Sequence, residues 1–118
     1  MTDSNTQPAG MPTHTPGPWF SPERRHGARY VWARIGGGLL QEVAACGPTQ
    51  EPTQQAANAR LIAASPSMLE ALRRADEFIS NGIALGYIRM PDADTPDSAH
   101  QTPGIVRAAI ALATKDQL

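Results

Sequence analysis

The chain of 118 residues has little of the chemistry that marks common enzyme and metal-binding classes. It has one cysteine, Cys46, so no disulfide framework can form within one chain, which is consistent with a reducing cytosol. Cys46 has no arrangement of His and acid near it that would favour a nucleophile, and it is best read as a small core residue. The three histidines stand far apart in the sequence, so no zinc-type cluster can be assembled. We therefore expect no metal and no cofactor.

Long apolar runs and an excess of one charge are also absent. No apolar stretch reaches the roughly 18 residues that a membrane-spanning helix needs. Residues 1–17 lack the basic start and apolar core of a secretion signal. The formal net charge of −1 gives no overall attraction to nucleic acid or to a membrane. We expect a soluble, intracellular protein for which membrane binding is excluded and nucleic-acid binding is disfavoured.

Lysine is nearly missing, since Lys115 is the single lysine beside nine arginines. A GC-rich genome is one explanation of this bias. The functional alternative is that guanidinium groups make two-point contacts with phosphate or carboxylate. Composition alone does not separate the two explanations.

The strongest helical signal lies in residues 53–79, where helix-favouring residues are dense and apolar ones recur every three or four positions. Proline disfavours helical geometry in the residue before it, so a first helix should end just before Ser65-Pro66, and a second should begin there with the serine as its cap. Asn81-Gly82 is expected to end the second helix. The pattern predicts a hairpin of two helices. The apolar stripe of the second helix is Met68, Leu69, Leu72, Ala75, Phe78 and Ile79.

Two strands of alternating pattern are predicted at residues 28–35 and 39–46. The three glycines at 36–38 join them as a tight hairpin turn. A phosphate-binding loop is the alternative reading of three glycines, but neither a Lys-Ser/Thr pair nor a helix follows them. The expected core side of the first strand is Val31, Ala33 and Ile35. The two faces of the second strand alternate Leu39, Gln41, Val43 and Ala45 with Leu40, Glu42, Ala44 and Cys46.

The other face of the first strand is the most distinctive surface of the chain. It carries Tyr30, Trp32 and Arg34, with further arginines nearby at Arg24, Arg25 and Arg29. One explanation is a half-buried outer face packed under loops. A second is an anion or nucleotide site, in which arginines hold phosphate and rings hold a base. A third is an oligomer interface, because Trp, Tyr and Arg are enriched at binding hot spots.

Self-association is also expected from the size of the fold. The sheet is small, and much of the apolar content is alanine, which buries little area per residue. The conformational entropy of an ordered domain of this length is on the order of 100 kcal/mol and must be offset by burial. We therefore expect a homo-oligomer, either a homodimer or a small multiple of dimers, formed through the Trp32 face.

Three further side chains are candidates for the same ligand site. Trp19 either covers one end of the core or forms a stacking platform for a base. Asn58 and Arg60 are polar residues in an alanine-rich helix, and they either make structural bonds or line the cleft between helix and sheet. The predicted ligand-binding set is Trp19, Arg24, Arg25, Tyr30, Trp32, Arg34, Asn58 and Arg60, with no catalytic and no metal-binding residue.

The remaining segments complete an α+β fold. Residues 1–14 are expected to be a disordered tail, and residues 15–115 a single domain. In residues 83–102 five apolar side chains could cover the open side of the core: Ile83, Leu85, Tyr87, Ile88 and Met90. The aspartates there do not have calcium-loop spacing. Thr102-Pro103 should start a C-terminal helix. The predicted fold is a small antiparallel sheet of two to three strands packed against a helical hairpin and a C-terminal helix.

Three segments of the sequence resemble a widespread family of small phage and prophage proteins. They are residues 15–19 (TPGPW), residues 58–72 (NARLIAASPSMLEAL) and the alanine-rich residues 108–113. The resemblance covers most of residues 13–114. It implies a non-structural accessory protein that acts on host or phage physiology in the cytoplasm of the host cell. Ser65 and Ser67-Met68 depart mildly from the family pattern, in which Ala and Glu-Leu are more usual.

The resemblance and the aromatic–arginine face together predict a non-enzymatic counter-defence protein that binds and sequesters a nucleotide-type immune signal. The alternative is a protein inhibitor that binds a host defence or regulatory complex. A small hydrolase is a second alternative, for which the sequence offers no acid–base pair, nucleophile or metal set. The expected partners are accordingly a nucleotide-type small molecule or a host protein.

Overall fold

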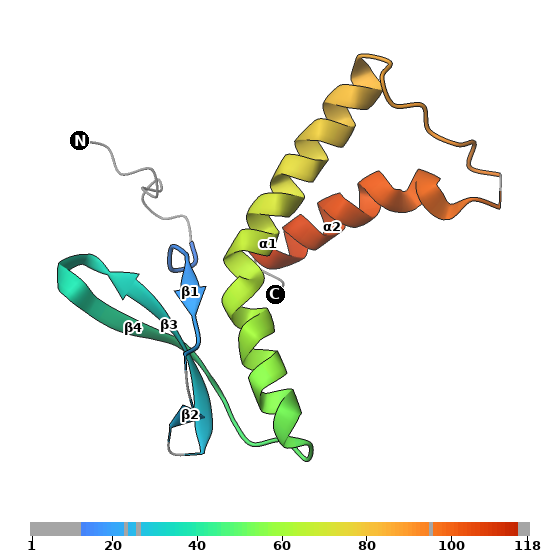
Figure 1. The fold of residues 1–118 in the computed structure, drawn as a ribbon. Coiled ribbons are helices and arrows are strands. Elements are labelled where there is room, and N and C mark those ends of the chain that lie inside the picture. The colour runs from blue at the N-terminus through green and yellow to red at the C-terminus, as the bar shows by residue number, and fades with distance from the viewer. Residues whose placement is uncertain (1–12, 23, 26, 95, 116–118) are drawn as a thin grey trace. The chain divides into compact units, whose positions relative to one another are not determined.

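The computed structural model of the protein describes residues 13–22, 24–25, 27–94 and 96–115 (Figure 1). Most of the predicted tail, residues 1–12, lies outside this part. The chain divides into two compact units, Met1–Ser67 and Met68–Leu118, and each is described by itself. The predicted α+β class with a small antiparallel sheet is confirmed. The single domain expected over residues 15–115 stays a prediction.

The sheet of the first unit is built around β3 (Ala28–Ile35), with which each of the other described strands pairs antiparallel. β4 (Leu39–Cys46) pairs along one edge of β3, as predicted. The two-residue strands β1 (Trp19–Phe20) and β2 (Arg24–Arg25) therefore share the other edge. The hairpin turn at Gly36–Gly38 is also confirmed, and two of its glycines have φ of 75° and 76°, which costs glycine little.

One residue of β4 interrupts the ladder with β3. Val31 pairs with Ala44, but the next residue, Trp32, pairs with Glu42, so Val43 is an extra residue on β4. A bulge of this kind shifts the alternation of side chains by one. The predicted faces of β4 are therefore wrong beyond this point, because Val43 and Ala44 both pack against the core.

The core of the first unit lies between the sheet and the first half of helix α1 (Pro52–Ala84). Gln55 crosses this contact with a side chain that is only 4% exposed. Its Nε2 donates to the carbonyl oxygens of Gly27 and Cys46, each at 2.9 Å. The amide therefore ties the start of α1 to the turn before β3 and to the end of β4. The buried residues Val31, Cys46 and Ala59 are surrounded by Trp19, Val43, Ala44, Ile62 and Ala63.

Helix α1 runs through Ser65-Pro66 without a break, which corrects the predicted hairpin of two helices. Pro66 lacks the N–H that would donate to the carbonyl of Ile62 in a regular helix. The hydroxyl of Ser65 donates to that carbonyl instead, at 2.7 Å. The serine thus satisfies the acceptor that the proline leaves open. Two α-helices, not three, are found in the part of the chain that the structure describes.

Pro66 also contacts the segment that leads into the sheet. A Cβ added at Gly17 would lie 2.9 Å from the Cβ of Pro66, closer than real Cβ contacts. Two residues further on, Trp19 Nε1 donates to the carbonyl of Thr15 at 3.1 Å. The TPGPW segment is thereby folded on itself and placed against the proline of α1.

Helix α1 passes its predicted stop at Gly82 and ends at Ala84. Gly86 has a φ of 81°, and its N–H donates to the carbonyl of Ile83 at 3.1 Å. The N–H of Tyr87 donates to the carbonyl of Gly82 at 2.8 Å. This pair of bonds is the Schellman arrangement, in which the glycine after the helix takes the left-handed conformation. The helix stops at Gly86 because that glycine has this conformation, and Gly82 does not.

Gly82 is needed for a different reason, the packing of the loop that follows. A Cβ at this position would lie 2.7 Å from Ile88 Cγ1, so Ile88 covers the bare backbone of the helix. Leu85 and Tyr87 are 70% and 85% exposed. The prediction that side chains of this segment cover the open side of the core concerns the other unit, so it stays a prediction.

The second unit ends with helix α2 (Thr102–Thr114), which follows a 3-10 turn at Ser98–Gln101. The predicted start at Thr102-Pro103 is confirmed, with the proline in the first turn, where its missing N–H leaves no bond unmade.

Candidate functional site

The side of the sheet that faces away from the core carries the clearest candidate site. Val31 and Ala33 are fully buried, so the residues that alternate with them in β3 point to the opposite side. β1 aligns Phe20 with Trp32 and adds a third ring to the same side. We name this surface the aromatic outer face: Phe20, Tyr30, Trp32 and Arg34.

Two pairs of residues within the aromatic outer face are in contact. The ring centroids of Tyr30 and Trp32 lie 5.6 Å apart with an angle of 31° between the planes. This spacing is typical of favourable aromatic pairs. The Arg34 guanidinium carbon lies 4.4 Å from the centroid of the Phe20 ring, as in a cation–π contact. The rings are half-buried and Arg34 is exposed, so the face presents ring surface with a cation at one end.

Arg29 is bonded to the residue that holds the backbone of Tyr30, and it is not part of the aromatic outer face. Its Nη2 donates to the carbonyl of Ser21 at 3.0 Å, and its Nε donates to the Ser21 hydroxyl at 3.3 Å. That hydroxyl donates in turn to the carbonyl of Tyr30 at 2.7 Å. The guanidinium therefore joins β3 to the segment after β1, next to the backbone of Tyr30.

Trp19, a predicted ligand-binding residue, lies on the core side of the sheet. It pairs with Ala33 in the register of β1 and packs against the buried cluster. Of the two explanations given for Trp19, the structure provides the contacts that cover one end of the core. Arg24 and Arg25 form β2, paired with Arg29 and Ala28 of β3.

Asn58 and Arg60 are both exposed on α1. The side of α1 that meets the sheet carries Gln55 and Ala59 instead, so Asn58 and Arg60 do not line the contact between helix and sheet. The structural bond expected of Asn58 is made by Gln55. The sequence does hold a signal for this, because Gln55 lies one helical turn before Ala59 on the apolar stripe.

Phe20 is the residue of the face that sequence reasoning missed. Trp19 and Phe20 are adjacent, and two neighbouring residues of a strand point to opposite sides. Once Trp19 is assigned to the core, the alternation alone places Phe20 with Tyr30 and Trp32. The structure therefore brings together three of the predicted residues and adds one.

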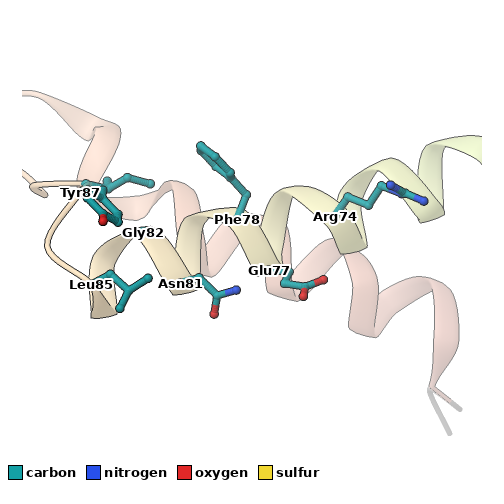
Figure 2. A pocket seen from close by; sticks show the side chains of 8 residues that line it. Arg74, Glu77, Phe78, Asn81, Gly82, Leu85 and Tyr87 are labelled. Carbon is teal, nitrogen blue, oxygen red and sulfur yellow. The ribbon is translucent and has the colours of Figure 1, made fainter.

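The second unit has a separate hollow of about 570 Å³ at the end of α1. Figure 2 shows Phe78 standing out from the helix and Tyr87 beside its last turn. Phe78 is 72% exposed. Arg74, at the other end, forms an ion pair with Glu70 at 3.1 Å. The lining consists of Arg74, Glu77, Phe78, Asn81, Gly82, Leu85, Tyr87 and Ile88.

Neither a metal-binding cluster nor a membrane-spanning helix is found among the described residues. No group of three or more His, Cys, Asp or Glu side chains among them is placed to hold a metal ion. None of the helices described is both long and apolar enough to cross a membrane.

The family model described as Salmonella phage P22 protein Y8K6 matches residues 6–117. The chain belongs to this phage protein family. Membership in the P22 Y8K6 family confirms the expected phage setting, while the individual sequence motifs and the activity are not addressed by it. The match includes the strands of the aromatic outer face and both helices. No curated protein and no solved structure gave a significant match.

Proposed function

We propose that this member of the P22 Y8K6 family is a non-enzymatic binding protein that captures a nucleotide-type ligand on its aromatic outer face. The observation that carries the proposal is the contacting ring pair Tyr30–Trp32, with Phe20 aligned beside Trp32 and the exposed Arg34 guanidinium over the Phe20 ring. Aromatic side chains stack on nucleobases of any sequence, and each stacked base contributes roughly 1–3 kcal/mol. An arginine at the edge of such a platform supplies two parallel donors to a phosphate.

The charge of the protein favours a small ligand over a long nucleic acid. The net charge is −1, and Glu42 is exposed directly opposite Trp32 in the strand register. A carboxylate beside the rings repels a continuous phosphate backbone, whereas one or two nucleotides can keep their phosphates at the Arg34 end. The platform is also short, since Tyr30 and Trp32 are separated by 5.6 Å between centroids.

Sequestration is favoured over catalysis by the chemistry of the face. Its side chains are three rings, one guanidinium and the neighbouring carboxylate of Glu42. These groups bind bases and phosphates but do not form a nucleophile with a base next to it. In a phage protein of the host cytoplasm, capture without turnover would lower the concentration of a nucleotide signal and so act in counter-defence.

Isothermal titration calorimetry with cyclic dinucleotides and with adenine mononucleotides tests the proposal. We expect Trp32→Ala to weaken binding about tenfold or more, because stacking on the indole is lost. Arg34→Gln should weaken binding of the phosphorylated ligands and leave binding of the free nucleoside nearly unchanged. Arg60→Gln is the matched control, since it removes an equally exposed arginine on α1. Flat titrations of the unchanged protein against the whole ligand panel would remove the proposal.

A protein partner is a second candidate, favoured by the apolar end of the β3–β4 hairpin. Ile35, Leu39 and Leu40 are 39%, 62% and 51% exposed there. Leu40 pairs with Arg34, which makes the hairpin end continuous with the aromatic outer face. If a host protein docks here, Leu39→Asp should abolish its capture from host lysate and leave nucleotide titrations unchanged. A host protein that still binds to Leu39→Asp would argue against the hairpin end as its docking surface.

A further inference from the structure

The second unit exposes an apolar stripe on α1 that is separate from the aromatic outer face. Its three large side chains, Met68, Phe78 and Leu85, are 47%, 72% and 70% exposed. The members recur at alternating intervals of three and four residues, which is the spacing of the first and fourth positions of a heptad. We name this stripe the α1 seam: Met68, Ala71, Ala75, Phe78, Gly82 and Leu85. Leu85 is the first residue after α1, and its N–H donates to the carbonyl of Asn81 at 2.9 Å, as in the helix.

The α1 seam lies next to a second stripe that is already covered. Leu69 is 7% exposed, and Leu72 and Ile79 are half-buried. At 100° per residue the two stripes together span roughly 200° of the helix surface, more than the roughly 100° that one packing contact uses. Four members of the seam are exposed: Met68, Ala71, Phe78 and Leu85. Ala75 is half-buried, and Gly82 is buried under Ile88 of the same chain. The polar remainder of the helix surface carries Glu70, Arg73, Glu77 and Ser80.

We infer that the α1 seam binds the α1 seam of a second copy of this chain, with the two helices antiparallel. A two-fold axis between residues 76 and 77 puts Met68 opposite the partner's Leu85 and Ala75 opposite the partner's Phe78. It also puts Ala71 opposite the partner's Gly82. In antiparallel helix pairs the first heptad position of one helix faces the fourth position of the other in this way. The same six residues of each copy therefore form every layer of the contact.

The sizes of the side chains fit the antiparallel order. Phe78 meets the small Ala75 of the partner, so a small residue faces a large one in the two central layers. Ala71 lies opposite Gly82, whose backbone is covered by Ile88 of its own chain. A parallel pair in register would instead place Phe78 on Phe78 and Ala71 on Ala71. That arrangement leaves a crowded layer beside an empty one, which costs stability.

The hollow at the end of α1 also has an occupant in this register. Leu85 lines the hollow, and the partner's Met68 lies opposite Leu85. Methionine is unbranched and flexible, and it fills irregular apolar space well. Arg74 and Glu77 at the rim carry opposite charges, so two copies meet without a net repulsion there. The partner's Met68 thus enters the hollow of about 570 Å³ and occupies part of it.

Sedimentation equilibrium of the full chain tests the association. We expect a dimer whose dissociation constant rises about tenfold or more in Phe78→Glu, because a charge is placed at the centre of the seam. Ser80→Glu adds the same charge at an exposed position of the polar side and should leave the constant unchanged. Circular dichroism checks that both variants keep their helix content. A monomer for the unchanged chain at about 100 μM, or equal constants for both variants, would overturn the inference.

Cysteine cross-linking in a Cys46→Ala background tests the antiparallel register. A mixture of Met68→Cys and Leu85→Cys chains should form a mixed disulfide on mild oxidation, because opposed positions in one layer come within the roughly 5–7 Å between Cα atoms that a disulfide spans. Neither variant alone should cross-link to itself. Self-linking of Met68→Cys, or no mixed product, would overturn the register. The inference does not depend on the proposed nucleotide binding, and neither experiment uses a nucleotide.

Discussion

At the residue scale, Gln55 is a polar side chain buried in an apolar contact. Its two hydrogen bonds join three segments, namely α1, the turn at Gly27 and the end of β4 at Cys46. A buried carbonyl that loses its donor retains the full cost of desolvation. The importance of Gln55 therefore comes from the acceptors it satisfies.

The first prediction follows from these bonds. Gln55→Ala should lower the free energy of unfolding by roughly 1–3 kcal/mol, because two carbonyl groups are left without their donor. Denaturant-induced unfolding measures the change. Gln54→Ala is the control, since Gln54 is exposed on the same turn of α1, and its effect should stay within about 0.5 kcal/mol. Equal effects of the two substitutions would contradict this explanation of Gln55.

Glycine residues give the second prediction, because the same substitution should have opposite signs at two sites. Gly86→Ala should destabilise by about 1 kcal/mol, since the residue has a φ of 81°. Gly104→Ala should stabilise by roughly 0.5–1 kcal/mol, since Gly104 is helical and exposed, and no atom lies within 4 Å of the added Cβ. Thermal unfolding of both variants measures the difference. A loss of stability at Gly104 would contradict the assignment.

At the scale of elements, Ser65 and Pro66 explain why α1 is one helix. The local sequence resembles the end of one helix and the start of another, and it therefore predicts a hairpin of two helices. The signal was overridden because the hydroxyl of Ser65 supplies the hydrogen bond to Ile62 that Pro66 cannot. Pro66 in turn packs against Gly17, a contact that needs the helix to continue to that point.

The third prediction is that Ser65 and Pro66 are energetically coupled. Ser65→Ala should cost about 1 kcal/mol in the natural chain, because the Ile62 carbonyl loses its donor. The same substitution should cost little when Pro66 is also alanine, because the new backbone N–H bonds to Ile62. A double-mutant cycle by chemical denaturation measures this coupling. Additive effects of the two substitutions would show that the hydroxyl does not compensate for the proline.

At the scale of the whole molecule, two surfaces have different assigned roles. The aromatic outer face belongs to the first unit, and the α1 seam belongs to the second. Large exposed apolar side chains such as Phe78 and Leu85 are costly in an isolated chain and are often buried in assemblies. Binding a second copy stabilises the folded state by mass action.

The fourth prediction concerns the dependence of thermal stability on protein concentration. For a dimer that dissociates as it unfolds, the melting temperature rises with concentration, whereas that of a monomer stays constant. We expect the rise in the unchanged chain and its loss in Phe78→Glu, as measured by differential scanning calorimetry over a hundredfold range of concentration. Ser80→Glu should keep the rise. Nucleotide binding should survive in Phe78→Glu, because the substitution leaves the aromatic outer face intact.

Local sequence patterns were sufficient to predict β3 and β4, the glycine turn between them and the start of α2. Alternation in residues 28–35 and the glycines at 36–38 depend on neighbours in sequence, so the sequence by itself determined the β3–β4 hairpin and the sides of Val31 and Tyr30. The phage setting was likewise visible in the sequence. These features do not require knowledge of what packs against them.

Tertiary structure decided the features that depend on distant partners. Val43 becomes a bulge because the residues on either side of it, Glu42 and Ala44, pair with β3. Trp19 goes to the core while Phe20 joins the outer face, and Gln55 rather than Asn58 bonds to the sheet. The position at which α1 ends also depends on the fold. Gly82 and Gly86 could each end a helix, but Ile88 packs on Gly82, and it is Gly86 that takes the left-handed conformation. Sequence specifies which conformations each segment permits, and contacts between segments select among them.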